Sequence, residues 1–194
     1  MYLHINLYKM KIIKSFFKQS VKIIKVTKYN DNRGYFSENY NFNKLKKLGI
    51  SEKFVQDNYS FSKNSNVIRG LHFQKPNKDQ SKLISVIKGS ILDIFVDIRK
   101  NSKTYGKYQS YKLNENDFKL IYIPSGFAHG FRVTSKNTLV IYKTSNFYSP
   151  KHEQTIRYND TNLKINWGSV RNIITSQKDK NGIIFNEFKT PFNE

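Results

Sequence analysis

Apolar and polar residues alternate along many short stretches of this chain, with a period close to two. In the clearest example every second residue from Leu92 to Ile98 is aliphatic, so one side of a strand would be apolar and the other mixed. Segments rich in Gly, Pro, Asn, Asp or Ser separate these runs, a pattern typical of antiparallel sandwiches and barrels. Strands are expected over 20–28, 35–40, 53–60, 67–73, 82–87, 91–98, 108–113, 120–123, 130–134 and 138–144.

Two of these expectations concern how strands are placed. The segment 20–28 alternates apolar residues loosely with lysines, which indicates a half-buried strand at the edge of a sheet. The runs 82–87 and 91–98 are joined by Lys88-Gly89-Ser90, a short connection with a glycine. Such a connection predicts a β-hairpin.

One helix is expected among the strands. Asn41 is a suitable N-cap, apolar residues recur at helical spacing after it, and Gly49 is a suitable end. The sequence after Trp167 is irregular, and residues 180–194 are expected to form a short helix or strand against the body of the protein.

A glycine in the stretch 66–74 bears on which side chains can meet. Arg69 and His72 are three positions apart, so in a regular strand they would point to opposite faces. A β-bulge at Gly70 would bring both to one side. We therefore expect a bulge there.

The length of 194 residues fits one domain with a sizeable core, and no repeat or linker divides the chain. We expect an N-terminal extension, in part disordered, over 1–19, a single domain over 20–180 and a C-terminal tail over 181–194. Met10 is an alternative start.

The charge is strongly positive, with 34 Lys and Arg against 14 Asp and Glu and a formal net charge of +20. The lysines are scattered rather than gathered in one block, so most are expected to be solvated surface, and neither nucleic acid nor a membrane is an expected partner. Cysteine is absent, and no apolar run approaches the roughly 18 residues of a membrane span. We expect a cytoplasmic protein.

The sequence lacks the motifs of several enzyme classes, and their absence narrows the reactions to consider. The four histidines, His4, His72, His129 and His152, form no His-x-His pair, so a zinc site is not expected. There is no nucleophile elbow and no glycine-rich phosphate loop, which argues against hydrolases and P-loop enzymes. Proton transfer is the simplest remaining chemistry. Taken singly, His72, Lys82, His129 and Tyr142 would each be ordinary structural residues.

Together these residues occur in a recognisable order. The chain resembles the dTDP-4-dehydrorhamnose 3,5-epimerases from about Arg33 to Asp179. The matching runs are Arg33–Glu38, Phe54–Asn58, Val67–Gln74, Val96–Arg99, Ser102–Gly106, Ile123–Phe131, Tyr142–Thr144, Tyr148–Pro150 and Lys178-Asp179. Ser81 departs from the pattern, because a glycine is common before the matching lysine.

The resemblance implies an all-β, cupin-like antiparallel jelly roll with one or a few short helices, acting as a homodimer without a cofactor. It makes His72 the general base, Asp179 its partner, Tyr142 the general acid and Tyr148 a stacking platform for the thymine ring. The residues it assigns to contacts with the nucleotide, diphosphate or sugar are Arg33, Glu38, Gln56, Asn58, Arg69, Lys82, His129, Glu153 and Lys178.

The implied reaction inverts C3 and C5 of dTDP-4-dehydro-6-deoxy-D-glucose, in dTDP-rhamnose biosynthesis. The C4 ketone acidifies the neighbouring hydrogens, so inversion needs a base on one face, an acid on the other and a donor for the enolate oxygen, a role that suits Lys82. The alternatives are an enzyme that inverts C3 only or acts on another nucleotide-linked 4-keto sugar, a non-catalytic jelly-roll binding module, and a nucleic-acid binder.

Overall fold

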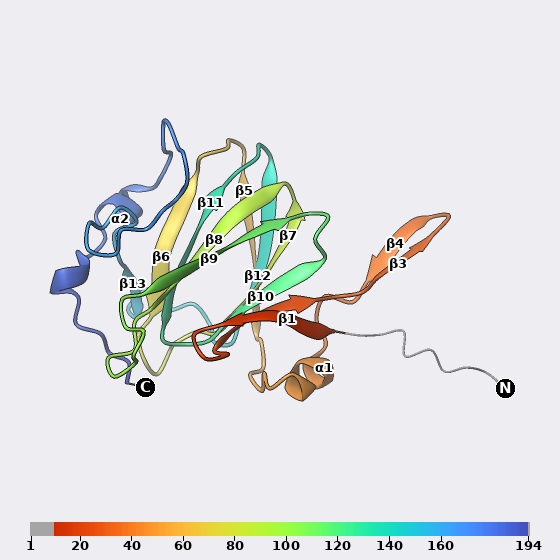
Figure 1. Ribbon diagram of the computed structural model, residues 1–194, viewed down its shortest axis with the longest axis horizontal. Helices are drawn as coiled ribbons and strands as arrows, with labels where there is room; N and C mark the ends of the chain where they lie inside the picture. The colour runs from red at the N-terminus through yellow and green to blue at the C-terminus, as the bar shows by residue number, and fades with distance from the viewer. Residues whose placement is uncertain (1–9, 194) are drawn as a thin grey trace.

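The computed structural model describes residues 10–193 and is built mainly from two antiparallel sheets that face each other (Figure 1). This confirms the all-β class. The six-stranded sheet has the order β1 (Lys11–Phe16), β2 (Val21–Lys25), β10 (Lys119–Ile123), β7 (Lys82–Lys88), β12 (Thr138–Thr144) and β5 (Gln56–Ser62). The five-stranded sheet has the order β13 (Glu153–Thr155), β6 (Ile68–Gln74), β11 (Phe127–Val133), β8 (Ser90–Asp97) and β9 (Tyr108–Asn114).

A two-stranded hairpin, β3 (Lys28–Asp31) and β4 (Gly34–Ser37), extends away from the two sheets (Figure 1). The short helices are α1 (Phe42–Lys47), α2 (Gln177–Lys180) and the 3₁₀ turn η1 (Phe185–Glu187). None of the helices within residues 10–193 is long and apolar enough to cross a membrane.

Apolar side chains form three layers, one between the two sheets and one on the outer face of each sheet. The first layer lies between the sheets and includes Phe95 and Ile84. The second lies on the outer face of the five-stranded sheet, where Trp167 and other residues of the C-terminal segment pack. The third lies on the outer face of the six-stranded sheet, where Leu45 of α1 packs.

Both faces of β8 are buried, and each contacts a different part of the protein. The aliphatic residues at alternate positions from Leu92 to Ile98 pack under the C-terminal segment, whereas Phe95 and Asp93 of the mixed face are fully buried. Both faces are therefore core, and the mixed face is the one that places polar groups inside the protein.

The predicted hairpin at Lys88-Gly89-Ser90 is wrong. Strand β7 pairs with β10 and β12 in one sheet, whereas β8 pairs with β9 and β11 in the other. Gly89 has φ +80°, and a Cβ there would lie 2.4 Å from Oγ1 of Thr138. The glycine therefore serves a tight crossing between sheets rather than a turn within one.

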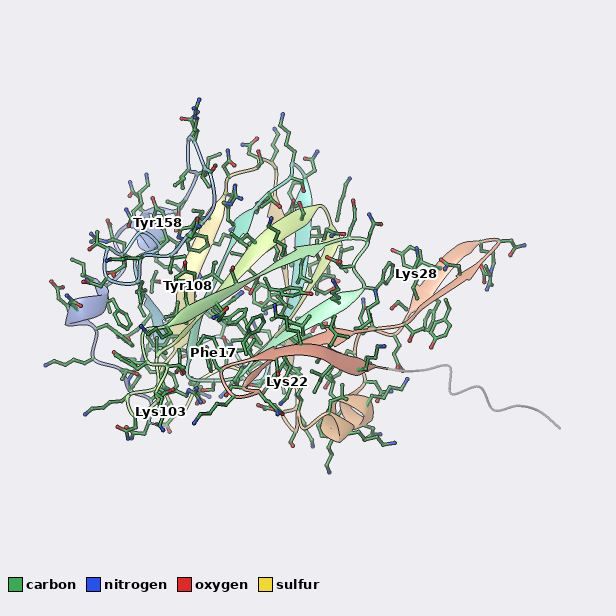
Figure 2. All side chains as sticks on the ribbon, in the orientation of Figure 1. Phe17, Lys22, Lys28, Lys103, Tyr108 and Tyr158 are labelled. Carbon is green, nitrogen blue, oxygen red and sulfur yellow. The ribbon has the colours of Figure 1, made fainter. Side chains whose placement is uncertain are left out.

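The N-terminal strands also differ from expectation. Strand β2 is not at an edge, because β1 pairs with it from the outside. Of the predicted extension over 1–19, residues 1–9 lie outside the described part of the chain, as does His4, and Lys11–Phe16 form β1. Phe17 then contacts the core, with its ring centroid 5.2 Å from that of Phe127 (Figure 2).

The predicted helix is confirmed as α1. The side chain of Asn41 accepts a hydrogen bond from the backbone N–H of Lys44 at 3.1 Å, and Gly49 follows the helix with φ +74°. In the C-terminal tail, η1 is the short helical turn, and Phe188 and Phe192 after it are buried against the five-stranded sheet.

The lysines are spread over the surface, as Lys22, Lys28 and Lys103 illustrate at well separated places (Figure 2). The net charge of +20 is therefore distributed over the surface, as the scattered lysines in the sequence indicate.

Candidate functional site

The predicted bulge in β6 is present and is centred on Gly70. His129 of β11 faces His72 of β6, but Phe131 faces Arg69, so three residue steps on β6 match two on β11. Gly70 has φ +117°, and a Cβ there would lie 2.5 Å from the Cα of Gly130. Because this position has a positive φ and no room for a side chain, only glycine fits without strain. The bulge turns Arg69 and His72 to the same side, and both line one cavity.

His72 is paired with an acid from the far end of the chain. Its Nε2 lies 2.6 Å from Oδ1 of Asp179 in α2, and Oδ2 of Asp179 accepts a hydrogen bond from the N–H of Gly70 at 3.2 Å. Ser176 caps α2 through a bond from the Asp179 N–H to its Oγ. The helix cap and the bulge thus both fix the position of the carboxylate.

The electrostatics of this pair favour an ionised acid. Burial by itself would raise the pKa of Asp179, but the hydrogen bond and charge of His72 and the bond from Gly70 outweigh it, so the pKa is lowered. An ionised Asp179 holds the Nε2 proton of His72 and leaves the other ring nitrogen to accept a proton.

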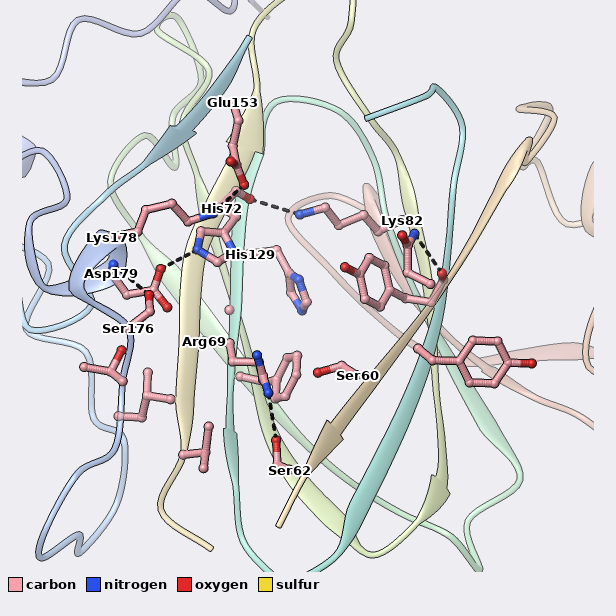
Figure 3. Close-up of a pocket in the computed structure, with 18 of the residues that line it drawn as sticks. Ser60, Ser62, Arg69, His72, Lys82, His129, Glu153, Ser176, Lys178 and Asp179 are labelled. Atoms are coloured by element: carbon pink, nitrogen blue, oxygen red, sulfur yellow. Dashed lines mark hydrogen bonds and ion pairs between the residues drawn. The ribbon is translucent and has the colours of Figure 1, made fainter. Parts of the chain in front are cut away.

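Lys82 reaches the cavity from the opposite sheet. It begins β7, is buried, and donates from Nζ to the backbone carbonyl of His72 at 3.0 Å (Figure 3). Burial lowers its pKa to about 8, against the opposing effect of the charges of Asp93 and Glu153. Lys82 is therefore an ammonium at neutral pH that deprotonates more easily than a surface lysine.

His129 lies next to His72 across the β6–β11 pairing and lines the same cavity. Its Nε2 is 2.8 Å from Oδ2 of Asp93, which is fully buried in β8. Burial lowers the pKa of His129 and raises that of Asp93, in each case against the attraction between the two. His129 is hence a neutral imidazole at physiological pH.

Tyr142 lines the cavity from β12, in the sheet opposite to His72. Burial raises the pKa of its phenol, so the hydroxyl keeps its proton well above neutral pH. A proton acceptor on one sheet and a proton donor on the other thus share one cavity.

A second group of polar contacts surrounds Tyr148 at the cavity wall. Its hydroxyl donates to Oε2 of Glu153 at 2.8 Å, and Oε1 of Glu153 accepts from Nζ of Lys178 at 2.7 Å. The backbone N–H of Tyr148 donates to Oε1 of Gln56, whose amide nitrogen donates to Asn58 at 2.8 Å. These contacts hold an exposed aromatic ring in place.

The cavity that these residues share has a volume of about 940 Å³ and lies between the two sheets, beside α2 (Figure 3). Of the sequence-predicted site residues, the structure brings eleven together as lining: Gln56, Asn58, Arg69, His72, Lys82, His129, Tyr142, Tyr148, Glu153, Lys178 and Asp179. Arg69 donates at 3.1 Å to the carbonyl of Phe61 on β5, a strand of the opposite sheet.

Arg33 and Glu38 are not among the lining residues. Arg33 lies in the β3–β4 hairpin, is exposed and pairs with Asp31 at 2.6 Å. Glu38 follows the hairpin and accepts hydrogen bonds from Asn41 and Lys44 near α1. Neither side chain therefore contacts the cavity of its own chain.

The sequence analysis missed Asp93 as a member of the site, and it missed the serines Ser60 and Ser62 of β5 that line the cavity. The signal for Asp93 was available, because an acid within a strongly apolar strand needs a partner. The serines had no such signal. Among residues 10–193 no group of three or more His, Cys, Asp or Glu side chains is arranged to hold a metal ion.

Comparison with known proteins gives one consistent family. A family model described as dTDP-4-dehydrorhamnose 3,5-epimerase matches residues 18–187. A curated protein of that name from Pseudomonas aeruginosa is 39% identical over 97 residues, which cover 50% of this chain and 54% of that protein. The aligned part of this chain thus spans about half the length of such curated relatives.

Solved structures match over more of the chain. A dTDP-4-dehydrorhamnose 3,5-epimerase from Bacillus anthracis with TDP and PPi bound has a TM-score of 0.88 and 40% identity, covering 91% of this chain and all of that one. The Legionella pneumophila dTDP-6-deoxy-D-glucose-3,5-epimerase in complex with dTDP-4-keto-L-rhamnose has a TM-score of 0.90 and 36% identity, covering 96% and 100%. The two facing sheets are thus the jelly roll of these proteins.

Proposed function

The chain belongs to the dTDP-4-dehydrorhamnose 3,5-epimerase family, and from this membership we propose that it is an isomerase that converts dTDP-4-dehydro-6-deoxy-D-glucose into dTDP-4-dehydro-L-rhamnose by inverting C3 and C5. The observation that carries the proposal is the placement of a His72–Asp179 pair and a protonated Tyr142 on opposite sheets around one cavity. The ketone is already in the substrate, so we propose that no cofactor takes part.

The proposed reaction proceeds by two proton transfers at each carbon. His72 removes the hydrogen from C3 or C5, the electron pair of the C–H bond moves into an enolate, and the negative charge develops on the C4 oxygen. Lys82 is the cation placed to stabilise that oxygen. Tyr142 then donates its proton to the carbon from the opposite face, which inverts the configuration.

The remaining cavity residues suit a nucleotide sugar. Arg69 and Lys178 are cations for the diphosphate, Tyr148 offers an aromatic face for thymine, and Gln56, Asn58, His129 and Glu153 offer polar contacts. The large positive charge of the chain would favour capture of such an anionic ligand.

We further propose that the protein is a homodimer in which the β3–β4 hairpin of one chain reaches the cavity of its partner. Arg33 and Glu38 have no access to their own cavity, and the hairpin extends from the sheets with Tyr35 and Phe36 61% and 63% exposed. Edge strand β5 also exposes Tyr59 and Phe61, 72% and 56% exposed, beside the cavity. A second copy would cover these apolar side chains.

The dimer is testable with two variants. Light scattering at micromolar concentration should give the mass of two chains, and a monomer would contradict the proposal. Arg33→Ala and His72→Ala should each be inactive, but co-expressed they should regain about a quarter of wild-type activity, because half of the dimers are mixed and have one intact site. No recovery would contradict a site shared between chains.

The reaction itself is tested in heavy water. Wild-type protein incubated with dTDP-4-dehydro-6-deoxyglucose should place deuterium at both C3 and C5 of the product, read by NMR. Label at C3 alone would establish the alternative of a 3-epimerase, and tight binding without exchange would establish a binding module. Affinity for an oligonucleotide that falls steeply with salt would support a nucleic-acid binder.

We place the reaction in dTDP-rhamnose biosynthesis in the cytoplasm, where its product would serve carbohydrate polymers such as the O antigen of lipopolysaccharide. Family membership supports the part of this proposal that concerns dTDP-rhamnose.

A further inference from the structure

Lys82 is a buried cation without a carboxylate in direct contact. It is 8% exposed, its hydrogen bond goes to the neutral carbonyl of His72, and none of the ion pairs found among residues 10–193 includes it. A buried ammonium in this situation tends to lose its proton, since burial disfavours the charged form. Something nearby must favour the charge if Lys82 is to act as a cation.

The charged or titratable groups around Lys82 come from six elements. They are Asp93 on β8, Glu153 on β13, Lys178 on α2, His129 on β11, His72 on β6 and Tyr142 on β12. Lys178 is a like charge, and Asp179 on α2 is taken up by His72 at 2.6 Å. Burial lowers the pKa of His129 and raises that of Tyr142, so neither of these groups offers a negative charge at neutral pH. The candidates for a counter-charge are therefore Asp93 and Glu153.

Glu153 is already matched by another cation. Its two oxygens accept from Nζ of Lys178 and from the hydroxyl of Tyr148. Lys178 and Glu153 have opposite effects on the pKa of Lys82, so together these two residues do little to favour its charged form.

Asp93 is differently placed. It is fully buried, its Oδ2 is 2.8 Å from Nε2 of His129, and its Oδ1 has no hydrogen-bond partner in the described part of the chain. A buried carboxylate oxygen without a partner is rare and costly, and it is best explained by a compensating charge close by. His129 supplies a hydrogen bond but no charge. Burial raises the pKa of Asp93, and Lys82 is the cation whose charge opposes this, so each of the two groups favours the ionised form of the other.

We propose that Asp93 is a positioning residue that keeps Lys82 protonated and fixes the tautomer of His129 in the cavity. With its Nε2 proton donated to Asp93, His129 presents its other ring nitrogen as an acceptor to the ligand. Asp93 itself acts through Lys82 and His129 and touches no ligand. The part that concerns catalysis rests on the proposed epimerase function, whereas the charge state of Lys82 does not.

The experiment measures the titration of Lys82 in ligand-free protein labelled with ¹³C at the lysine ε carbons, with the resonance assigned by Lys82→Arg. In wild type the midpoint should lie near pH 8, well apart from the surface lysines. Asp93→Asn should lower the midpoint by about one pH unit. The alkaline limb of the pH profile of kcat/KM should move the same way.

The matched control is Asp117→Asn, which makes the same change at a turn outside the cavity, where Asp117 pairs with Lys119. It should leave the Lys82 midpoint unchanged. An unchanged midpoint in folded Asp93→Asn protein, judged by near-ultraviolet circular dichroism, would overturn the proposal. A wild-type midpoint below pH 7 would also overturn it, and that result needs no folded variant.

The two proposals fail separately. If wild-type protein does not exchange hydrogen in the dTDP sugar but Asp93→Asn still lowers the Lys82 midpoint, the epimerase function is wrong and the role of Asp93 toward Lys82 stands. If wild-type protein exchanges hydrogen in the dTDP sugar but Asp93→Asn leaves the Lys82 midpoint unchanged, the epimerase function stands and the role of Asp93 toward Lys82 is wrong.

Discussion

His72 and Asp179 are separated by 107 positions in the chain, yet Nε2 of one lies 2.6 Å from Oδ1 of the other. The C-terminal segment packs on the outer face of the five-stranded sheet, and within it α2 brings the acid into contact with the bulge of β6. The pair therefore depends on the packing of a segment that also lines the cavity with Ser176 and Lys178.

Asp179→Asn should lower kcat by roughly 10²–10⁴-fold, because the amide cannot hold the imidazole in the same tautomer or stabilise its charged form. The measurement is steady-state kinetics of epimerisation. Asp160→Asn is the control, since Asp160 is a buried acid of the same segment that accepts from backbone N–H groups outside the cavity. It should lower stability with little effect on kcat, and equal losses of kcat would contradict a special role for Asp179.

Tyr142→Phe should separate exchange from inversion. His72 can still remove and return a proton on its own face, so deuterium exchange should persist, while inversion falls on the order of 10²-fold for want of a donor opposite. Both rates come from one NMR time course in heavy water. Tyr105→Phe, in a tyrosine outside the cavity whose ring contacts Phe185, should change neither. Parallel loss of exchange and inversion in Tyr142→Phe would count against the two-face mechanism.

Gly70→Ala should lower the free energy of unfolding by about 3 kcal/mol or more, from a strained φ together with overpacking against Gly130. Urea denaturation measures the loss. Gly34→Ala separates the two causes, because Gly34 has a comparable φ of +131° but nothing within 4 Å of the added Cβ. It should cost less, about 1–2 kcal/mol. Similar losses at both positions would mean that the close approach at Gly70 is unimportant.

Asp97 should make stability depend on pH in the acid range. Burial opposes its ionisation, but hydrogen bonds from Arg99, Ser102 and Thr104 outweigh this and hold its pKa below the usual range. A carboxyl with a lowered pKa in the folded state adds stability above its unfolded pKa of about 3.9, which is lost as pH falls through the folded value. Urea denaturation from about pH 5 down to about pH 2.5 should show less pH dependence for Asp97→Asn than for wild type. Equal pH dependence in the two proteins would mean that Asp97 contributes nothing to it.

Local patterns predicted the local structure well. The cap at Asn41, the helix end at Gly49 and the bulge at Gly70 follow from nearby residues alone. The residues that meet across the cavity, such as His72 and Tyr142, were grouped by resemblance rather than by spacing. Their meeting depends on pairing between distant strands, which a local pattern does not contain.

The errors have the same origin. A glycine between two strands fits a hairpin and a crossing between sheets equally well, so Gly89 did not distinguish them. The aliphatic side of β8 is buried, as its pattern indicates, but it packs under the C-terminal segment, and the interior between the sheets receives the mixed side with Asp93. Which face is the interior depends on Trp167 and its neighbours, more than 60 residues away.

His72 is proposed as the base for both carbons, and deuterium incorporation by His72→Ala tests this role. Wild-type protein should label C3 and C5 of the dTDP sugar in heavy water, and so should the control His152→Ala, whose histidine bonds Ser149 outside the cavity. His72→Ala should label neither carbon. Labelling of either carbon at the wild-type rate by folded His72→Ala protein would contradict the account.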